Sequence, residues 1–112
     1  EAMWKILQQK KPEDFVIATG RQYSIRQFVN KVAASLSMKI KWKGKGIKEK
    51  CYDLNTKKII IECDKSYFRP LDVNTLLGDA KKARIKLKWK PKISVENLIK
   101  EMVEDQLKKI DY

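Results

Sequence analysis

The sequence of 112 residues predicts a small α/β or α+β domain in which short strands alternate with helices. Three observations support this fold class. Residues 24–36 begin with a Ser-x-x-Gln capping box and then place apolar side chains at helical spacing. Residues 38–42 alternate apolar side chains with lysines, as a half-buried strand does. Residues 94–110 return to the 3.6-residue period behind a serine that can cap a helix.

The first element is expected to be a helix that ends before Pro12. Residue 1 is Glu and no capping residue precedes the apolar stripe, so we expect the chain to begin inside or just before a helix of a longer protein. Residues 14–20 are expected to form a short buried strand that ends in a glycine turn. The apolar stripe of the first helix consists of Met3, Trp4, Ile6 and Leu7.

The sequence pattern in the middle of the chain predicts a loop, a strand and a short helix. Residues 44–57 carry two glycines and mixed charge without a period, which indicates a loop. The β-branched residues 58–62 predict a strand that leads into an Arg-Pro turn. Asp79 can cap a helix that runs through Leu87. The inner face of this helix is expected to hold Ala80, Ala83 and Leu87.

Composition allows one small domain with one small core. Hydrophobic residues make up 43% of the chain, and we assign the three tryptophans and the three methionines to the core. That core is also expected to take the helical stripe of Phe28, Val29 and Val32.

The chain is strongly basic, with 26 Lys and Arg residues against 14 Asp and Glu residues and a net charge of +12. Such a balance is compatible with nucleic acid, an anionic membrane or a phosphate-bearing ligand. The lysines are spread over the whole chain, which favours an ordinary solvated surface. A basic nucleic-acid-binding module stays an alternative that charge alone supports. Aromatic residues interleave with the basic ones only at Trp42 and Trp89.

Metal, membrane and secretion signals are missing from the sequence. There is no histidine, and Cys51 and Cys63 lack CxxC spacing, which excludes the usual zinc sites and predicts reduced thiols. No apolar run approaches the roughly 20 residues of a membrane span, and no signal peptide is recognisable. We therefore expect a cytoplasmic protein without a membrane partner.

The sequence carries few groups that could act as catalysts. The four glycines never take GxGxxG spacing, and no GxSxG elbow occurs. A short-chain dehydrogenase also needs a Tyr followed four residues later by Lys, because the lysine lowers the pKa of the phenol. No tyrosine of this chain has that lysine: Tyr23, Tyr52 and Tyr67 are followed by Gln27, Thr56 and Leu71, and Tyr112 is the last residue. By itself the chain is not expected to be a redox catalyst.

A binding site is the better prediction, and it centres on Arg69. Pro70 locks its own φ and restricts the residue before it to extended conformations, so the arginine is held on a stiff turn. A guanidinium suits bidentate contact with a diphosphate, and the carboxylate of Asp72 can accept hydrogen bonds from ribose hydroxyls. An ordinary surface turn with an Asx-type cap is the alternative interpretation of these residues.

Several segments, in this order, resemble the closing part of GDP-mannose 4,6-dehydratases, which belong to the extended short-chain dehydrogenase/reductase family. The Leu-x-Trp-x-Pro pattern at residues 87–91 is common to that superfamily, whereas the Phe-Arg-Pro turn with its following acid and the Leu-Leu-Gly-Asp run narrow the resemblance to the GDP-mannose branch. The matching segments are residues 1–4, 12–20, 22–29, 67–79, 88–91 and 101–103.

This resemblance implies that residues 1–112 form the small C-terminal substrate-binding lobe, without the N-terminal Rossmann domain against which residues 1–20 would pack. Arg69 then matches the arginine that holds the nucleotide diphosphate, and Asp72 matches the acid that holds the ribose. The family more often has Glu at that position. Tyr23 and Arg26 fall in a matching segment near the pocket wall. Alternatively, Tyr23 packs beside the helix cap, and Arg26 forms a structural ion pair with an acid.

The resemblance also implies the activity of a complete enzyme. Such enzymes convert GDP-mannose to GDP-4-keto-6-deoxy-mannose with loss of water, using tightly bound NADP, on a route to deoxyhexoses such as fucose. The NADP would be bound by the N-terminal domain, so catalytic, cofactor-binding and metal-binding residues are not expected in this segment, and the isolated chain is expected to be inactive. A homo-oligomer is expected for the full-length form. The same lobe of another nucleotide-sugar epimerase, dehydratase or reductase is the alternative.

Overall fold

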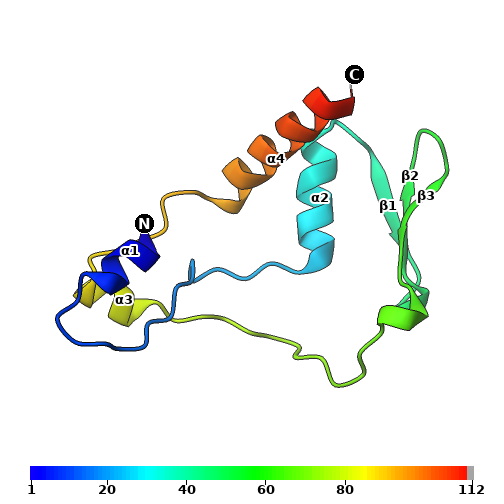
Figure 1. The fold of residues 1–112 in the computed structure, drawn as a ribbon. Helices are drawn as coiled ribbons and strands as arrows, with labels where there is room; N and C mark the ends of the chain where they lie inside the picture. Colours follow the sequence, from blue (N-terminus) through cyan, green and yellow to red (C-terminus); the bar gives the residue numbers. More distant parts are fainter. Residues whose placement is uncertain (111–112) are drawn as a thin grey trace. The chain divides into compact units, whose positions relative to one another are not determined.

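A computed structural model describes residues 1–110 of the chain, which divide into two compact units. The first unit combines residues 1–23 with residues 73–94. The second combines residues 24–72 with the segment from Val95 onward. Figure 1 shows the helices and strands of both units along the chain. Short helices and a three-stranded antiparallel sheet confirm the predicted small α+β fold.

The first unit contains two short helices, α1 (Ala2–Leu7) and α3 (Lys81–Lys86). Its core is the predicted inner face of α3, because Ala80, Ala83 and Leu87 are all buried. Asp79 lies just before the helix, and its carboxylate Oδ1 accepts a hydrogen bond from the Lys81 N–H at 2.9 Å. The side chains that pack against this core from elsewhere in the unit are Ile6, Phe15, Ala18 and Trp89.

The predicted strand at residues 14–20 is wrong, since residues 12–19 form neither helix nor strand. The apolar run does not alternate between a buried and an exposed face: Val16 is 52% exposed and Ile17 is 42% exposed. Phe15 and Ala18 instead turn toward the α3 core as isolated anchors. A strand needs a neighbour for its backbone hydrogen bonds, and the described part of this unit offers none.

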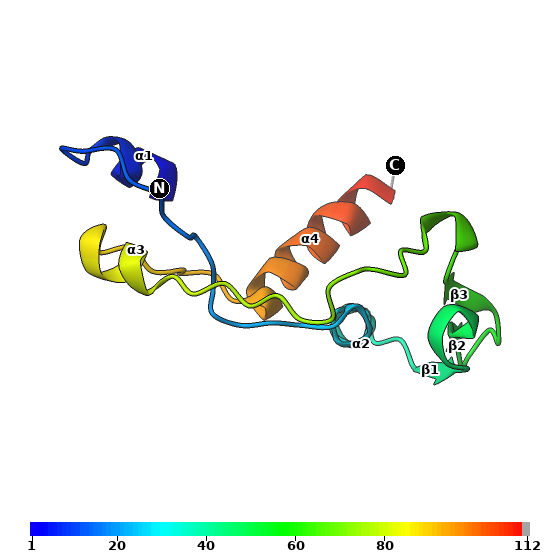
Figure 2. The same cartoon turned by 90° about the horizontal axis from the view of Figure 1, so that it is seen from below.

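The second unit contains the sheet, in the order β1 (Ile40–Lys43), β2 (Lys50–Asp53) and β3 (Ile59–Glu62). Both neighbouring pairs are antiparallel, and Figure 2 shows the three strands together. The predicted strands near β1 and β3 are confirmed. The predicted loop at residues 44–57 is wrong, because it contains β2 and the 3-10 helix η1 (Gly46–Lys48). β2 is the central strand, so pairing on both sides stabilises a segment whose own pattern is weak.

Helix α2 (Ile25–Ser35) begins as predicted at a complete capping box. The Gln27 N–H donates to Ser24 Oγ at 3.1 Å, and the Ser24 N–H donates to Gln27 Oε1 at 2.8 Å. The helix is tied to β1 by the Trp42 indole, whose Nε1–H donates to Asn30 Oδ1 at 2.8 Å.

Helix α4 (Val95–Ile110) packs against α2 within the second unit. Ala33 of α2 and Ile99 of α4 are buried, and the Lys31 ammonium pairs with Glu96 Oε1 at 2.6 Å. Both helices follow the sequence prediction closely, because each is amphipathic over several turns and needs no distant strand partner.

The predicted core is only partly correct. Trp42 and Trp89 are half-buried, as are Val29 and Val32. The assignment is wrong for four other side chains, since Met3 is 80%, Trp4 64%, Met102 53% and Phe28 37% exposed. None of the helices within residues 1–110 is both long and apolar enough to cross a membrane.

Candidate functional site

The segment that carries the predicted site is held by a chain of local turns, and we call residues 64–72 the arginine strap. It follows β3 and begins with Asp64, which caps the 3-10 helix η2 (Lys65–Tyr67). Asp64 Oδ1 accepts hydrogen bonds from the Ser66 hydroxyl at 2.7 Å and the Ser66 N–H at 2.9 Å. These two bonds lower the pKa of Asp64, because they favour the ionised carboxylate.

The strap continues into the predicted Arg-Pro turn. The Asp72 N–H donates to the Arg69 carbonyl at 3.3 Å, with Pro70 and Leu71 between them. Pro70 therefore occupies the second position of a four-residue β-turn, where its fixed φ is favourable and its missing N–H costs no hydrogen bond. The structure thus brings Arg69 and Asp72 to the two ends of one turn, as the sequence predicts.

The side chain of Arg69 is exposed, and within the described residues it has no hydrogen bond or ion pair. Its neighbours on the strap are also exposed: Tyr67 is 82%, Phe68 58% and Leu71 95% accessible. The turn consequently fixes the backbone of Arg69 and leaves the guanidinium available for an anion.

Arg26 has a different environment. It lies in the first turn of α2, its guanidinium forms an ion pair with Glu49, and it sits 5.5 Å above the centroid of the Trp42 ring. These contacts link α2 to the sheet, which is the structural role that the sequence left open for this residue. Tyr23, the remaining predicted site residue, is half-buried and belongs to the other compact unit.

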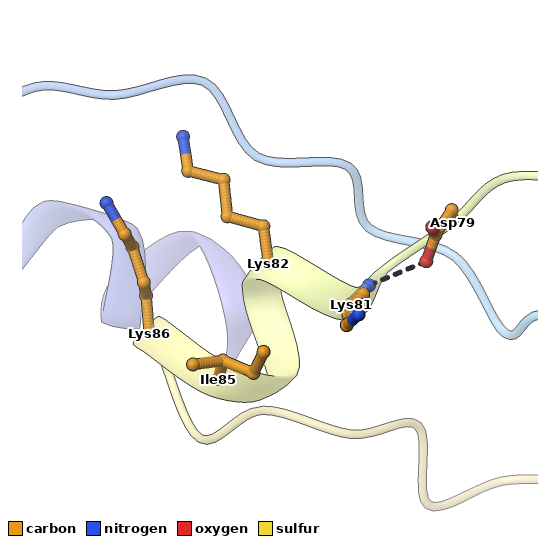
Figure 3. Close-up of a pocket in the computed structure, with 5 residues that line it drawn as sticks. All are labelled: Asp79, Lys81, Lys82, Ile85 and Lys86. Atoms are coloured by element: carbon orange, nitrogen blue, oxygen red, sulfur yellow. Dashed lines mark hydrogen bonds between the residues drawn. The ribbon is translucent and has the colours of Figure 1, made fainter.

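A lysine-lined hollow of about 430 Å³ lies beside α3 in the first unit, and Figure 3 shows its lining. Lys82 and Lys86 extend from the same side of the helix, away from Ile85. Lys82 Nζ donates to the Asp14 carbonyl at 2.8 Å, and Lys86 Nζ donates to Glu13 Oε1 at 2.7 Å. The contact with Lys86 is the main reason why the pKa of Glu13 is lowered. These lysines hold the 13–15 segment against α3, so the hollow is a weaker anion site than the strap.

The two thiols lie in different environments. Cys51 is buried in β2, and burial raises the pKa of its thiol. Cys63 is exposed, and its Sγ–H donates weakly to the Gly46 carbonyl at 3.8 Å. Within residues 1–110 no group of three or more His, Cys, Asp or Glu side chains could hold a metal ion.

Sequence reasoning missed three residues that shape these sites. Asp64 and Ser66 cap the strap, and the Asp-x-Ser spacing is a local signal that could have found them. Glu49, the partner of Arg26, has no such signal, because the two residues are far apart in the sequence and meet only in the folded unit.

The fold and the strap together define a small α+β lobe that carries an exposed arginine on a β-turn. Comparison with known proteins identifies the family to which this lobe belongs. The family model for GDP-mannose 4,6 dehydratase matches residues 1–102. A GDP-mannose 4,6 dehydratase of Dictyostelium discoideum is 46% identical over 110 residues, covering 98% of this chain and 31% of the relative.

Relatives from distant organisms show the same likeness. A GDP-mannose 4,6-dehydratase of Vibrio cholerae is 44% identical over 115 residues, covering 94% of this chain and 31% of the relative. A human GDP-mannose 4,6 dehydratase is 45% identical over 103 residues, covering 92% of this chain and 28% of the relative. The chain therefore belongs to the GDP-mannose 4,6 dehydratase family, and it spans about 30% of the length of these relatives.

Proposed function

We propose that this chain is the substrate-binding part of a GDP-mannose 4,6-dehydratase, a lyase of the extended short-chain dehydrogenase/reductase family. The complete enzyme would convert GDP-mannose to GDP-4-keto-6-deoxy-mannose with loss of water, and it would serve deoxyhexose biosynthesis of the GDP-fucose type in the cytoplasm as a homo-oligomer. The support is the family membership over residues 1–102 and the relatives' shared name.

The single observation that carries a role for particular residues is the Arg69 turn. Its guanidinium is exposed and has no partner among the described residues, whereas its backbone is held by the hydrogen bond from the Asp72 N–H. Arg69 would bind the diphosphate of GDP-mannose through two parallel N–H bonds, and Asp72 would accept hydrogen bonds from the ribose. The contribution to catalysis is positioning of the substrate.

The family reaction uses NADP, and the residues described here do not fit that cofactor. A dinucleotide site needs a glycine-rich turn that joins a strand to a helix, so that the pyrophosphate meets a helix N-terminus. Gly44 lies between β1 and the short η1, Gly46 is the first residue of η1, and Gly20 and Gly78 follow no strand. We propose that NADP is bound outside this segment, and we assign no step to the cofactor here.

We also propose that residues 1–20 pack against another domain of the complete enzyme. The outward side of α1 is apolar, with Met3 and Leu7 each 80% exposed and Trp4 64% exposed. An apolar patch of this kind in a soluble protein normally has a partner. The isolated chain should therefore self-associate, which sedimentation velocity over a range of concentrations would detect. A monomer at every concentration, with a cooperative melt at high temperature, would contradict this assignment.

The activity is best tested in a chimera in which this chain replaces the matching segment of the Dictyostelium relative. The folded, NADP-loaded chimera should consume GDP-mannose, and the isolated chain should show neither turnover nor NADP binding. A folded chimera that ignores GDP-mannose but accepts a UDP-sugar would instead identify the lobe of a different nucleotide-sugar enzyme.

A further inference from the structure

Asp64 is a polar anchor of the arginine strap, five residues before the arginine. The carboxylate of Asp64 is the acceptor for both donors of Ser66, the hydroxyl at 2.7 Å and the N–H at 2.9 Å. Both of these bonds are local, since they join residues two positions apart. The side chains of Tyr67, Phe68 and Leu71 are exposed and pack little against the rest of the unit. The two bonds of Asp64 therefore restrain the exposed start of the strap.

Two backbone hydrogen bonds order the residues between Asp64 and Arg69. The Tyr67 N–H donates to the Asp64 carbonyl at 3.2 Å, and the Phe68 N–H donates to the Lys65 carbonyl at 3.3 Å, which together close η2. Phe68 is then extended, with φ −68° and ψ 127°, and the β-turn begins at the following residue. The hydrogen bonds of η2 therefore end at Phe68, directly before Arg69, the first residue of the turn.

We propose that Asp64 is a positioning residue for Arg69: by capping η2 it fixes the direction in which the strap leaves β3, and so the place at which the guanidinium meets a nucleotide diphosphate. This inference rests on the proposed function, since it assumes that Arg69 binds the diphosphate. Asp64 itself does not touch the ligand in this scheme. Its contribution is preorganisation, which lowers the entropy lost when the ligand orders the strap.

Two other features of the molecule, an apolar groove and a hollow lined by lysines, do not support a binding proposal. The apolar groove of about 320 Å³ between α2 and α4 has nothing in the structure to indicate what would fill it. The hollow beside Cys63 contains lysines, but its acids already neutralise part of their charge, as Lys50 pairs with Glu62 at 3.5 Å. For Asp64, the hydrogen-bond distances, the exposure of the neighbouring residues and the short backbone connection to Arg69 all support one role, that of a positioning residue.

The test uses the 112-residue chain labelled with ¹⁵N, at a concentration at which sedimentation velocity shows a monomer, with free GDP as the probe. In wild type, the heteronuclear NOE of Phe68, Arg69 and Asp72 should be that of ordered backbone. Asp64→Ala should lower these values, whereas Asp64→Asn should keep them, because an amide oxygen also caps. Ser66→Ala removes the hydroxyl bond and keeps the N–H bond, so its effect should be intermediate. Unchanged NOE values in Asp64→Ala would overturn the proposal, whether or not the chain binds GDP.

Binding supplies the second measurement. GDP should shift the Arg69 Nε–Hε resonance, and Asp64→Ala should weaken GDP binding about threefold to tenfold, the range of a lost capping bond. Asp64→Asn should restore the affinity. The matched control is Asp79→Ala, which removes the same kind of Asx bond, from Asp79 to the Lys81 N–H, in the other unit. It should change neither measurement.

The outcomes separate the two proposals. If wild-type chain fails to bind GDP while the NOE values respond as expected, the positioning of the strap stands and the diphosphate role of Arg69 in this chain is wrong. If GDP binds and Asp64→Ala loosens the strap without weakening binding, Asp64 orders the strap but has no role in the site, and the positioning proposal fails.

Discussion

The two arginines of the second unit are fixed in opposite ways. Arg26 is held through its side chain, which pairs with Glu49 and lies over the Trp42 ring. Arg69 is held through its backbone, by the β-turn with Asp72, while its guanidinium faces solvent. A guanidinium that already has protein partners contributes to stability, whereas one that is positioned without partners keeps its donors for a ligand. The contrast predicts that substitution of the two arginines should separate binding from stability.

The largest effect should come from Arg69→Ala in the chimera described above. It should weaken GDP-mannose binding, or lower kcat/KM, by about 2 to 4 kcal/mol, because a bidentate charge-assisted contact is lost. Arg69→Lys should recover only part of this loss, since a point charge cannot reproduce the planar fork. Calorimetry and initial rates would measure both, and NADP affinity should not change.

The control for Arg69 is Arg84→Ala, which removes one exposed positive charge from α3 and so lowers the net charge equally. It should leave GDP-mannose binding unchanged. If Arg69→Ala has no effect while Arg26→Ala abolishes binding, the two arginines have been assigned the wrong way round.

A smaller effect on binding is expected at Asp72. Asp72→Ala should weaken GDP-mannose binding by about 0.5 to 3 kcal/mol, the range spanned by neutral and charged hydrogen bonds. Asp72→Glu, which introduces the residue that the resemblance gives as commoner, should be neutral or slightly favourable. Calorimetry with GDP and with 2′-deoxy-GDP would check the assigned contact. Equal losses for both nucleotides in Asp72→Ala would argue against a bond to that ribose hydroxyl.

Arg26→Ala should act on stability instead. The variant loses a partly exposed ion pair and a cation–π contact, so its free energy of unfolding should fall by about 1 kcal/mol. Urea unfolding followed by tryptophan fluorescence would measure this, because Trp42 reports on the same contact. GDP affinity measured below the unfolding transition should stay at the wild-type value, and a tenfold loss there would place Arg26 in the binding site.

The parts of the fold that the sequence predicted are those whose signals are local. The capping box at Ser24 and the long apolar periods identify α2 and α4, and Pro70 identifies the turn that carries Arg69. Each of these elements is specified by residues within a few positions of one another, so no knowledge of distant neighbours is needed.

The elements that could not be predicted depend on distant partners. β2 exists because β1 and β3 pair with it, and residues 14–20 stay irregular because no strand within residues 1–110 pairs with them. The predicted site residues show the same difference. The Arg-Pro turn is visible in the sequence, whereas Arg26 and Glu49 are far apart in the sequence and pair only in the folded unit. Sequence alone therefore named both arginines and left the role of Arg26 open between the pocket wall and a structural pair with an acid.

The smallest predicted effect compares two turns that use the same chemistry. Asp53 accepts hydrogen bonds from the Asn55 N–H at 2.9 Å and the Thr56 hydroxyl at 2.8 Å, much as Asp64 does with Ser66. Asp53 is 9% exposed, whereas Asp64 is exposed on the strap. The Asn55 and Thr56 bonds lower the pKa of Asp53 below its value in the unfolded chain.

The sign of the pH effect follows from that lowered pKa. The stability that Asp53 contributes is fully present above the unfolded pKa of about 3.9 and is lost as the pH falls through it toward the folded value. The urea midpoint of the wild-type chain should therefore fall between pH 6 and pH 3. Asp53→Asn should reduce this fall more than Asp64→Asn does, because the Asp53 turn joins β2 to β3, whereas the strap follows the sheet. An equal reduction in both variants would mean that the strap contributes as much to stability as the hairpin, against its assignment as a positioning element.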